Sequence, residues 1–347
     1  METRRKKSIL LITLVILALL AVTLASCKAS KSEDGNETNN TSDSEDQNKI
    51  TGATGFQGIA IARDGYIALA DPDGSNERRL TSQSAGYKDL SFSPSGDRVA
   101  ATKVVSDSMP QLVLIAVEGG IETDVSWTNP DYSAAWIKAG VDPWFGNISW
   151  ASDDILYCTG VKNVNDQQKL LVVKYVLSEH QITVIKEDAK DPAISPDGKK
   201  LAYIHKSADF MQTQGRNWAA EDFGDLVMQD LAGETSKTLR GNIFEAVFTP
   251  ESEHMAVVYF DEPDTALQLT DLEGTRLYTL SHIGPSGTIS HPSFSPAGDR
   301  LIANRGWTET PGQAMQQTIF TCASNADNPT PNDLGKGRDP SWSPATQ

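Results

Sequence analysis

Residues 89–97 read Asp-Leu-Ser-Phe-Ser-Pro-Ser-Gly-Asp, and this phrase decides the fold because it returns along the chain. It combines a polar residue, a small residue, an aromatic residue, Ser-Pro and a glycine turn. The aromatic anchor, replaced once by isoleucine, recurs at intervals of 58, 44, 54, 46 and 48 residues. A period of about 40–50 residues in a sequence rich in β formers is typical of β-propeller blades. The six anchors are Phe92, Trp150, Ile194, Phe248, Phe294 and Trp342.

The stretch after each phrase predicts further strands. After the first copy, 98–102 and 112–117 are rich in strong β formers, and the turn at 118–120 contains Glu-Gly-Gly. The same order of two β runs, a turn and a polar segment follows the next four copies. Short runs of this kind between turn residues predict four-stranded antiparallel blades, and hence an all-β fold.

The two ends of the repeat region complement each other. The last copy stops one strand into a blade, whereas 58–62, 66–70 and 76–81 supply second, third and fourth strands without a first. We therefore predict a six-bladed β-propeller in which the C-terminal strand joins the N-terminal blade and closes the ring. Closure covers strand edges that would otherwise pair with other chains.

The phrase of aromatic residue, Ser-Pro, Asp and Gly resembles the repeat of TolB-like β-propellers over roughly residues 57–347. The match is specific in four of the six copies and looser at Trp150 and Phe248, where the glycine or the proline is missing. The resemblance does not extend to the α/β domain that precedes the propeller in TolB itself. It therefore implies the fold and carries over no TolB partner.

The N-terminus has the features of an export signal. Four bases at 4–7 precede an apolar run at 9–25, which is marginal in length for spanning a membrane. The run ends in Leu24-Ala-Ser-Cys27, which resembles the lipobox of bacterial lipoproteins. That resemblance implies cleavage before Cys27 and a lipid anchor, with palmitate-type acyl chains, on the cysteine. The other interpretation is a membrane-anchoring helix in which Cys27 is incidental.

These observations divide the chain into a signal peptide (1–26), a lipidated cysteine with a flexible acidic tether (27–56) and the propeller (57–347). The tether has almost no large apolar residues, so burial cannot offset the entropy of ordering it. The net charge of −16 excludes nucleic acid as a main partner. We expect a monomer that is anchored to a membrane of the bacterial cell envelope, outside the cytoplasm.

Long connections gather on one face of the predicted ring. The turns after first and third strands are mostly tight, whereas most insertions follow second and fourth strands, as at 105–110, 161–168, 207–224, 282–290 and 307–315. The longest is 127–146. We call this side the insertion face and the opposite side the turn face. Five tryptophans lie in or beside the insertions, and they either cap the core or form a platform for a partner. They are Trp127, Trp136, Trp144, Trp218 and Trp307.

A second candidate site follows from superposing the repeats. One position begins every first strand, and first strands line the axis of a propeller, so these six residues should ring the channel mouth. One interpretation is that Asp-Pro only shapes the strand entry. The other is that converging carboxylates repel one another unless a cation binds between them, such as a divalent ion or a partner's Lys, Arg or N-terminus. The six residues are Asp89, Asn147, Asp191, Glu245, His291 and Asp339.

Motifs of catalysis are scarce. The sequence has no Gly-X-Ser-X-Gly, P-loop or His-Glu-X-X-His motif. We therefore predict a non-enzymatic protein without a cofactor that binds a protein, peptide or envelope ligand on the insertion face. The alternative is an extracytoplasmic carbohydrate-active lyase or hydrolase with axial acids and histidines. In that case His205, His282 and His291 would be candidate metal ligands.

Overall fold

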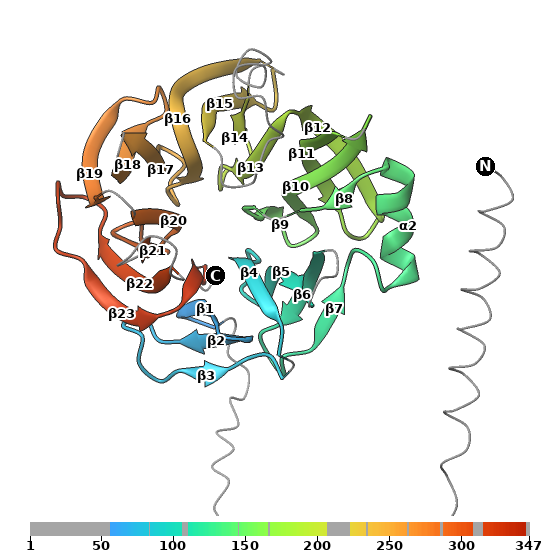
Figure 1. The fold of residues 1–347 in the computed structure, drawn as a ribbon, viewed down its shortest axis with the longest axis horizontal. Helices are drawn as coiled ribbons and strands as arrows, with labels where there is room; N and C mark the ends of the chain where they lie inside the picture. The colour runs from blue at the N-terminus through green and yellow to red at the C-terminus, as the bar shows by residue number, and fades with distance from the viewer. Residues whose placement is uncertain are drawn as a thin grey trace, which may run out of the picture. The chain divides into compact units, whose positions relative to one another are not determined.

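The six copies of the phrase form the innermost strands of six antiparallel blades, which follow one another around an axis (Figure 1). The computed structural model describes residues 56–344, except 83, 106–109, 145, 166, 207–222, 234, 262–263, 285–286 and 308–314. All described residues belong to one compact unit. The predicted six-bladed all-β fold is confirmed.

Blades 1 to 3 are numbered from the N-terminus, and their strands are given from the axis outward. Blade 1 contains β24 (Arg338–Trp342), β1 (Ile59–Arg63), β2 (Tyr66–Ala70) and β3 (Arg78–Arg79). Blade 2 contains β4 (Gly86–Phe92), β5 (Arg98–Val104), β6 (Gln111–Ala116) and β7 (Glu122–Asp124). Blade 3 contains β9 (Ser149–Ser152), β10 (Ile155–Val164), β11 (Gln167–Val176) and β12 (Gln181–Glu187), and β8 (Asp142–Pro143) extends its inner edge.

In blades 4 and 5 one long strand belongs to two blades. Blade 4 contains β13 (Ala189–Ile194), β14 (Lys200–His205), β15 (Gly224–Asp230) and the first half of β16 (Ser236–Phe248). Blade 5 begins with the second half of β16 and continues with β17 (His254–Asp261), β18 (Asp264–Asp271) and β19 (Arg276–Ile283). Blade 6 contains β20 (Gly287–Phe294), β21 (Arg300–Trp307), β22 (Gln316–Ala323) and β23 (Asn332–Lys336).

The ring closes where the two ends of the repeat region meet. Strand β24 pairs antiparallel with β1, with Trp342 opposite Ile59. Beyond this ladder, Ser343 and Gly58 exchange hydrogen bonds of 2.9 Å through the Ser343 backbone N–H and hydroxyl. In Figure 1 the red C-terminal strand lies beside the blue N-terminal strand. The predicted composite blade is therefore confirmed.

The Ser-Pro-X-Gly-Asp part of the phrase builds the turn between the first two strands. In blade 2 the Ser93 hydroxyl donates to Asp97 Oδ1 at 2.8 Å and accepts from the Arg98 backbone N–H at 3.2 Å. Gly96 has φ 72°, a left-handed conformation that glycine adopts without steric cost. The phrase is therefore a self-contained turn as well as the start of a blade.

The serine before the anchor residue joins neighbouring blades. Ser341 Oγ of blade 1 accepts a hydrogen bond from the Phe92 backbone N–H of blade 2, at 3.3 Å. Ser149 makes the same bond to Ile194 at 2.9 Å, and Ser293 makes it to Trp342 at 3.0 Å. A short hydroxyl at this position can satisfy a backbone donor that would otherwise be buried unpaired.

The core consists of apolar layers between successive blades. The layer between blades 6 and 1 contains Ile302 and Ile319 from one side and Ile59, Ile61 and Trp342 from the other. Five further clusters fill the other blade contacts in the same way. Phe56, the last residue of the predicted tether, already stacks on Phe92 at 6.1 Å between ring centroids.

The insertion at 127–146 contains a helix, which is an addition to the predicted all-strand blades. Helix α2 (Pro130–Ala139) begins at Asn129, whose side chain accepts from the Asp131 backbone N–H, and ends at Gly140 in the left-handed conformation. It packs against the outer strand β12, and Tyr132 contacts His180 in the turn before that strand. This part of the insertion therefore lies on the outer edge of blade 3. It does not extend the insertion face, where the sequence had led us to expect it.

Two further observations concern the whole propeller. Among the described residues, no helix has the length and hydropathy needed to cross a lipid bilayer. Cys158 and Cys322 are free and buried on blades 3 and 6, and burial raises the pKa of the Cys158 thiol to about 12. Both cysteines are therefore packing residues, because thiol reactivity requires the thiolate.

Candidate functional site

The axial residues have an unusual backbone in common. Asp89, Asp191, His291 and Asp339 all have φ between 49° and 55°, the left-handed region. Aspartate and histidine tolerate this region better than most residues. The strand ladder skips at each of these positions, which marks a β-bulge. Bulges redirect side chains, and here they turn the residues of distant blades toward one another.

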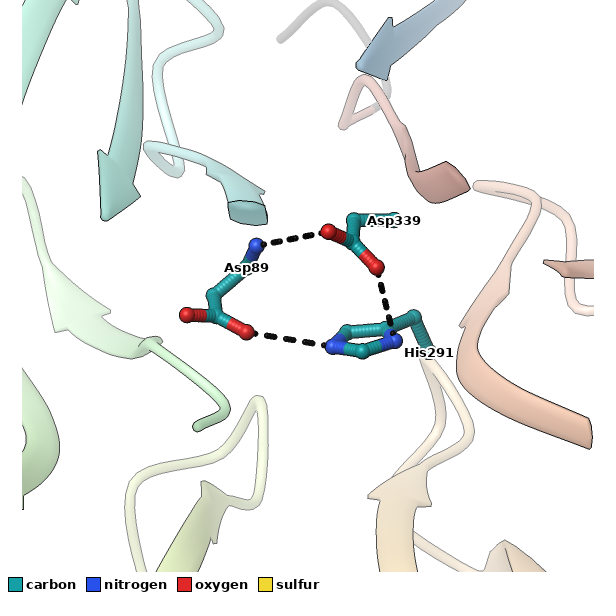
Figure 2. A group of neighbouring side chains, drawn as sticks. All are labelled: Asp89, His291 and Asp339. Carbon is teal, nitrogen blue, oxygen red and sulfur yellow. Dashed lines mark hydrogen bonds and ion pairs between the residues drawn. The ribbon is translucent and has the colours of Figure 1, made fainter. Parts of the chain in front are cut away.

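His291 is the centre of the axial cluster (Figure 2). Its Nε2 lies 3.1 Å from Asp89 Oδ1, and its Nδ1 lies 3.0 Å from Asp339 Oδ1. The His291 backbone N–H donates to Glu245 Oε2 at 2.6 Å, and the Asp89 backbone N–H donates to Asp339 Oδ2 at 3.4 Å. Strands of blades 1, 2, 5 and 6 therefore meet at one imidazole.

Charge and burial give the cluster its electrostatic character. The side chains of Asp89 and Asp339 are only 5% and 6% exposed. Burial alone would lower the pKa of His291, but the carboxylates of Asp339 and Glu245 outweigh it and raise that pKa well above the usual value. Burial would raise the pKa of Asp339, but the His291 imidazolium lowers it instead. Burial raises the pKa of Glu245.

The remaining axial residues form a second group at blades 3 and 4. Lys190 Nζ lies 2.7 Å from Asp191 Oδ2, and the Lys190 side chain is only 3% exposed. The other oxygen of Asp191 accepts from the Asn147 backbone N–H at 3.1 Å. Two cationic side chains of the chain itself, Lys190 and His291, thus lie within 3.1 Å of axial carboxylates. The interpretation in which the axial acids bind an external cation did not include these contacts with the chain's own side chains.

Three of the six axial residues border a small cavity of about 110 Å³. Asp89, Asn147 and His291 line it together with serines and prolines of the inner strands. Among the described residues, Asp89, His291 and Asp339 are the set whose donor atoms approach within 4.8 Å of one another. However, both imidazole nitrogens already face carboxylates, so the imidazolium stands where a cation would. Binding of an external cation at this mouth stays a prediction.

The described tryptophans differ in burial, and Trp136 fits the interpretation in which a tryptophan caps the core. Trp136 lies on α2 and is fully buried, with Nε1 donating to the Val125 carbonyl at 2.9 Å. Its prediction as a binding residue is wrong, because the helix turns the indole into the core against Tyr175. Trp127, Trp144 and Trp307 are half-buried. Trp218 and Cys27 lie outside the described residues.

A phenylalanine cluster on the insertion face was missed. Phe223 and Phe260 stack at 5.2 Å between ring centroids, and Phe244 meets both edge to face at 5.7 and 6.0 Å. All three residues are half-buried. The Arg240 guanidinium lies 3.8 Å from the centre of the Tyr259 ring, which packs on the core between blades 4 and 5, whereas Phe244 packs on the core between blades 5 and 6. Phe223 directly precedes β15 after the insertion, whereas Phe244 lies within β16 and Phe260 lies near the end of β17, so their meeting has no common signal in the sequence.

The histidine set of the enzyme alternative is not brought together. His282 on β19 contacts Asp264 at 3.0 Å, and its side chain is half exposed. His205 ends β14, and burial lowers its pKa. Neither residue belongs to the group of potential ligands around His291 in the described part of the chain.

Comparison with known proteins places the chain by its fold. No protein-family model matches the sequence, and no curated protein matches it. The structure is similar to TolB from Acinetobacter baumannii, with a TM-score of 0.59 and 15% identity over 83% of this chain. This chain covers 66% of that one, just under two thirds.

Two further solved structures cover almost the whole of the compared chain. A structure assigned to TolB from Agrobacterium tumefaciens has a TM-score of 0.58 and 13% identity, over 84% of this chain and 96% of that one. A chain in a nidogen–laminin complex has a TM-score of 0.57 and 10% identity, over 83% of this chain and 98% of that one. At such identities the likeness concerns the fold, and this chain has the fold of a TolB-like β-propeller.

Proposed function

We propose that this protein is a lipid-anchored binding protein of the bacterial cell envelope, which recognises a protein or peptide on the insertion face of its propeller. The observation that carries the proposal is the phenylalanine cluster. Phe223, Phe244 and Phe260 come from blades 4 and 5 and bring three half-buried rings into contact with one another. Aromatic residues are enriched in protein interfaces, and clustered apolar groups at a surface mark interaction sites.

The net charge of the chain favours a partner of particular chemistry. The chain as a whole carries −16, which would attract a segment with basic residues. The proposed partner is therefore a protein segment with apolar side chains flanked by Lys or Arg.

The axial cluster supports a binding protein better than the alternative lyase or hydrolase. A general base must offer a free nitrogen or oxygen to the substrate. Both nitrogens of His291 face carboxylates, at 3.0 and 3.1 Å, and the ammonium group of Lys190 engages Asp191 at 2.7 Å. The His291 contacts join blades and the Lys190 contact lies within one strand, so these contacts do not present a reactive group to a substrate.

Site-specific photo-crosslinking in intact cells tests the binding face. A photoreactive phenylalanine analogue at Phe244 or Phe260 of the full chain should give discrete protein adducts. The matched control is the same analogue at Tyr278, which is 37% exposed beside a turn-face cavity lined by Glu251 and Gly298. Equal adducts at Tyr278, or none at the two phenylalanine positions, would refute the proposed face.

The lipid anchor has a separate test, because it concerns the N-terminal segment. Cys27→Ser should abolish acylation and processing, since the thioether needs the cysteine sulfur. Metabolic labelling with a fatty-acid analogue and intact-mass measurement of the membrane fraction would show this. Wild-type protein without lipid would overturn the anchor and leave the binding face untouched.

A further inference from the structure

We propose that His291 is an electrostatic latch on the strand that closes the ring, so that alkaline pH loosens the joint between blades 6, 1 and 2. The inference does not depend on the proposed binding function. It starts from the position of Asp339, which lies in β24, the strand that completes blade 1 by pairing with β1. That strand is only five residues long, and it ends next to the C-terminus.

The His291 imidazole connects this strand to the blades before and after it. His291 comes from blade 6 and contacts Asp339 of blade 1 at 3.0 Å and Asp89 of blade 2 at 3.1 Å. The Asp89 backbone N–H also donates to Asp339 at 3.4 Å. The three residues form a triangle in Figure 2. The closing strand is thereby tied to both of its neighbouring blades through one side chain.

The latch works only while the imidazole is charged. A neutral imidazole donates one hydrogen bond, so one of its two nitrogens would face a carboxylate as an acceptor without a proton between them. The imidazolium has a proton on each nitrogen: Nε2 is hydrogen-bonded to Asp89 Oδ1, and Nδ1 forms an ion pair with Asp339 Oδ1 at 3.0 Å that lacks hydrogen-bond geometry. Losing the proton therefore breaks one contact and leaves buried negative charges uncompensated.

Other charged groups around His291 act in the same direction or lie further out. Glu245 Oε1 on β16 is 3.9 Å from Nδ1, and Arg338 on β24 is 4.0 Å from Asp339 Oδ2. Lys190 and Asp191 on β13 act electrostatically on Glu245. From β21, the neutral Asn304 accepts from the Asp339 backbone N–H at 3.3 Å.

The sign of the pH effect follows from linkage. The carboxylates raise the pKa of His291 well above its usual value in the folded protein. Its contribution to stability is therefore fully present below about pH 6.5 and is lost as pH rises through the folded pKa. Over this window a single proton changes the unfolding equilibrium constant by up to about tenfold per pH unit.

The test compares wild type with His291→Gln, with an Asp89→Asn, Asp339→Asn double variant, and with His282→Gln as control. His282 also faces an aspartate, at 3.0 Å, but it is half exposed and on an outer strand. Denaturant unfolding between pH 6 and 9 should show a fall in stability for wild type and His282→Gln. His291→Gln and the double variant should lack most of this slope.

Hydrogen exchange and NMR keep the test decisive if a variant folds poorly. In wild type, exchange of the β24 and β1 amides, corrected for intrinsic rates, should accelerate with pH by at least tenfold relative to β13 and β14. The ring carbons of His291 should report an imidazolium at pH 7.5. A His291 that titrates at or below 6.5, or an unchanged slope in His291→Gln, would overturn the latch.

Discussion

The axial cluster has two halves that neutralise buried carboxylates with different cations. At blades 3 and 4 the cation is Lys190, the residue immediately before Asp191, at 2.7 Å. At blades 6, 1 and 2 it is His291, which reaches Asp89 across 202 positions of the sequence. The lysine half needs only a local contact, whereas the histidine half exists only when the ring is closed.

This difference assigns the two halves different roles. The lysine half is a contact between neighbouring residues of one strand, Lys190 and Asp191 of β13. Histidine is the side chain whose ordinary pKa lies in that range. The closing joint is therefore the part of the propeller whose strength depends on pH, and the continuous blade 4 is its internal reference.

The largest effect should come from removing the closing strand. Deletion of 338–347 removes β24, including Asp339 and the buried Trp342. Loss of one large buried aromatic side chain costs about 3–5 kcal/mol, which is much of the 5–15 kcal/mol typical of a domain. The truncated protein should aggregate and lose its cooperative thermal transition in calorimetry. Deletion of only 345–347 is the control, and an unchanged Tm for the longer deletion would contradict composite closure.

Breaking the lysine half should have the next largest effect. Lys190→Met leaves the Asp191 carboxylate buried with the Asn147 N–H but without its cation. Removing one partner of a buried ion pair typically costs about 3–5 kcal/mol. Urea unfolding measures this cost. Lys199→Met, at an exposed pair with Asp197, should leave the free energy of unfolding unchanged. Equal losses of stability in Lys190→Met and Lys199→Met would refute the contrast between the buried and the exposed ion pair.

Removing the charge of Glu245 should stabilise the protein, whereas the two preceding changes should destabilise it. Burial raises its pKa, so its ionised form destabilises the folded protein at neutral pH. The protonated form stabilises the fold below about pH 4.5, and this contribution is lost as pH rises through the folded pKa. Glu245→Gln keeps an acceptor for the His291 backbone N–H and should raise Tm at pH 7 by about 2 °C. Calorimetry measures this shift, with Glu179→Gln at an exposed site as the control. A Tm of Glu245→Gln below that of wild type would be inconsistent with the burial argument.

The smallest effect concerns the serines between blades. Ser341→Ala removes the acceptor for the buried Phe92 backbone N–H and should cost about 1 kcal/mol. Blades 4 and 5 have Ala193 and Val247 at the same position, so the repeat tolerates the loss locally. Chemical unfolding should show a larger loss of stability for Ser341→Ala than for the exposed control Ser236→Ala. A cost no larger than that of the control would show that the inter-blade bond is dispensable at the closing joint too.

The sequence by itself determined the architecture of this protein, because the length of the repeat and the β runs within it are those of a propeller blade. The spacing of the anchor residues predicts blades, and the missing first strand before Ile59 predicts that Trp342 supplies it; both are confirmed by strand pairing. The signals of helix α2 were also present, since Asn129 and Gly140 are typical N-terminal and C-terminal caps. At ten residues the helix is too short to show a long helical periodicity in the sequence.

Only the tertiary structure decided the chemistry at the axis and on the insertion face. Superposed repeats placed His291 among acids, but they could not tell that its two nitrogens reach Asp89 and Asp339 at once. Likewise the burial of Trp136 and the meeting of Phe223 with Phe260 depend on where long connections pack. The physical reason is that periodicity fixes the position of a residue within its blade. Its contacts depend on side chains that other blades deliver from distant parts of the chain.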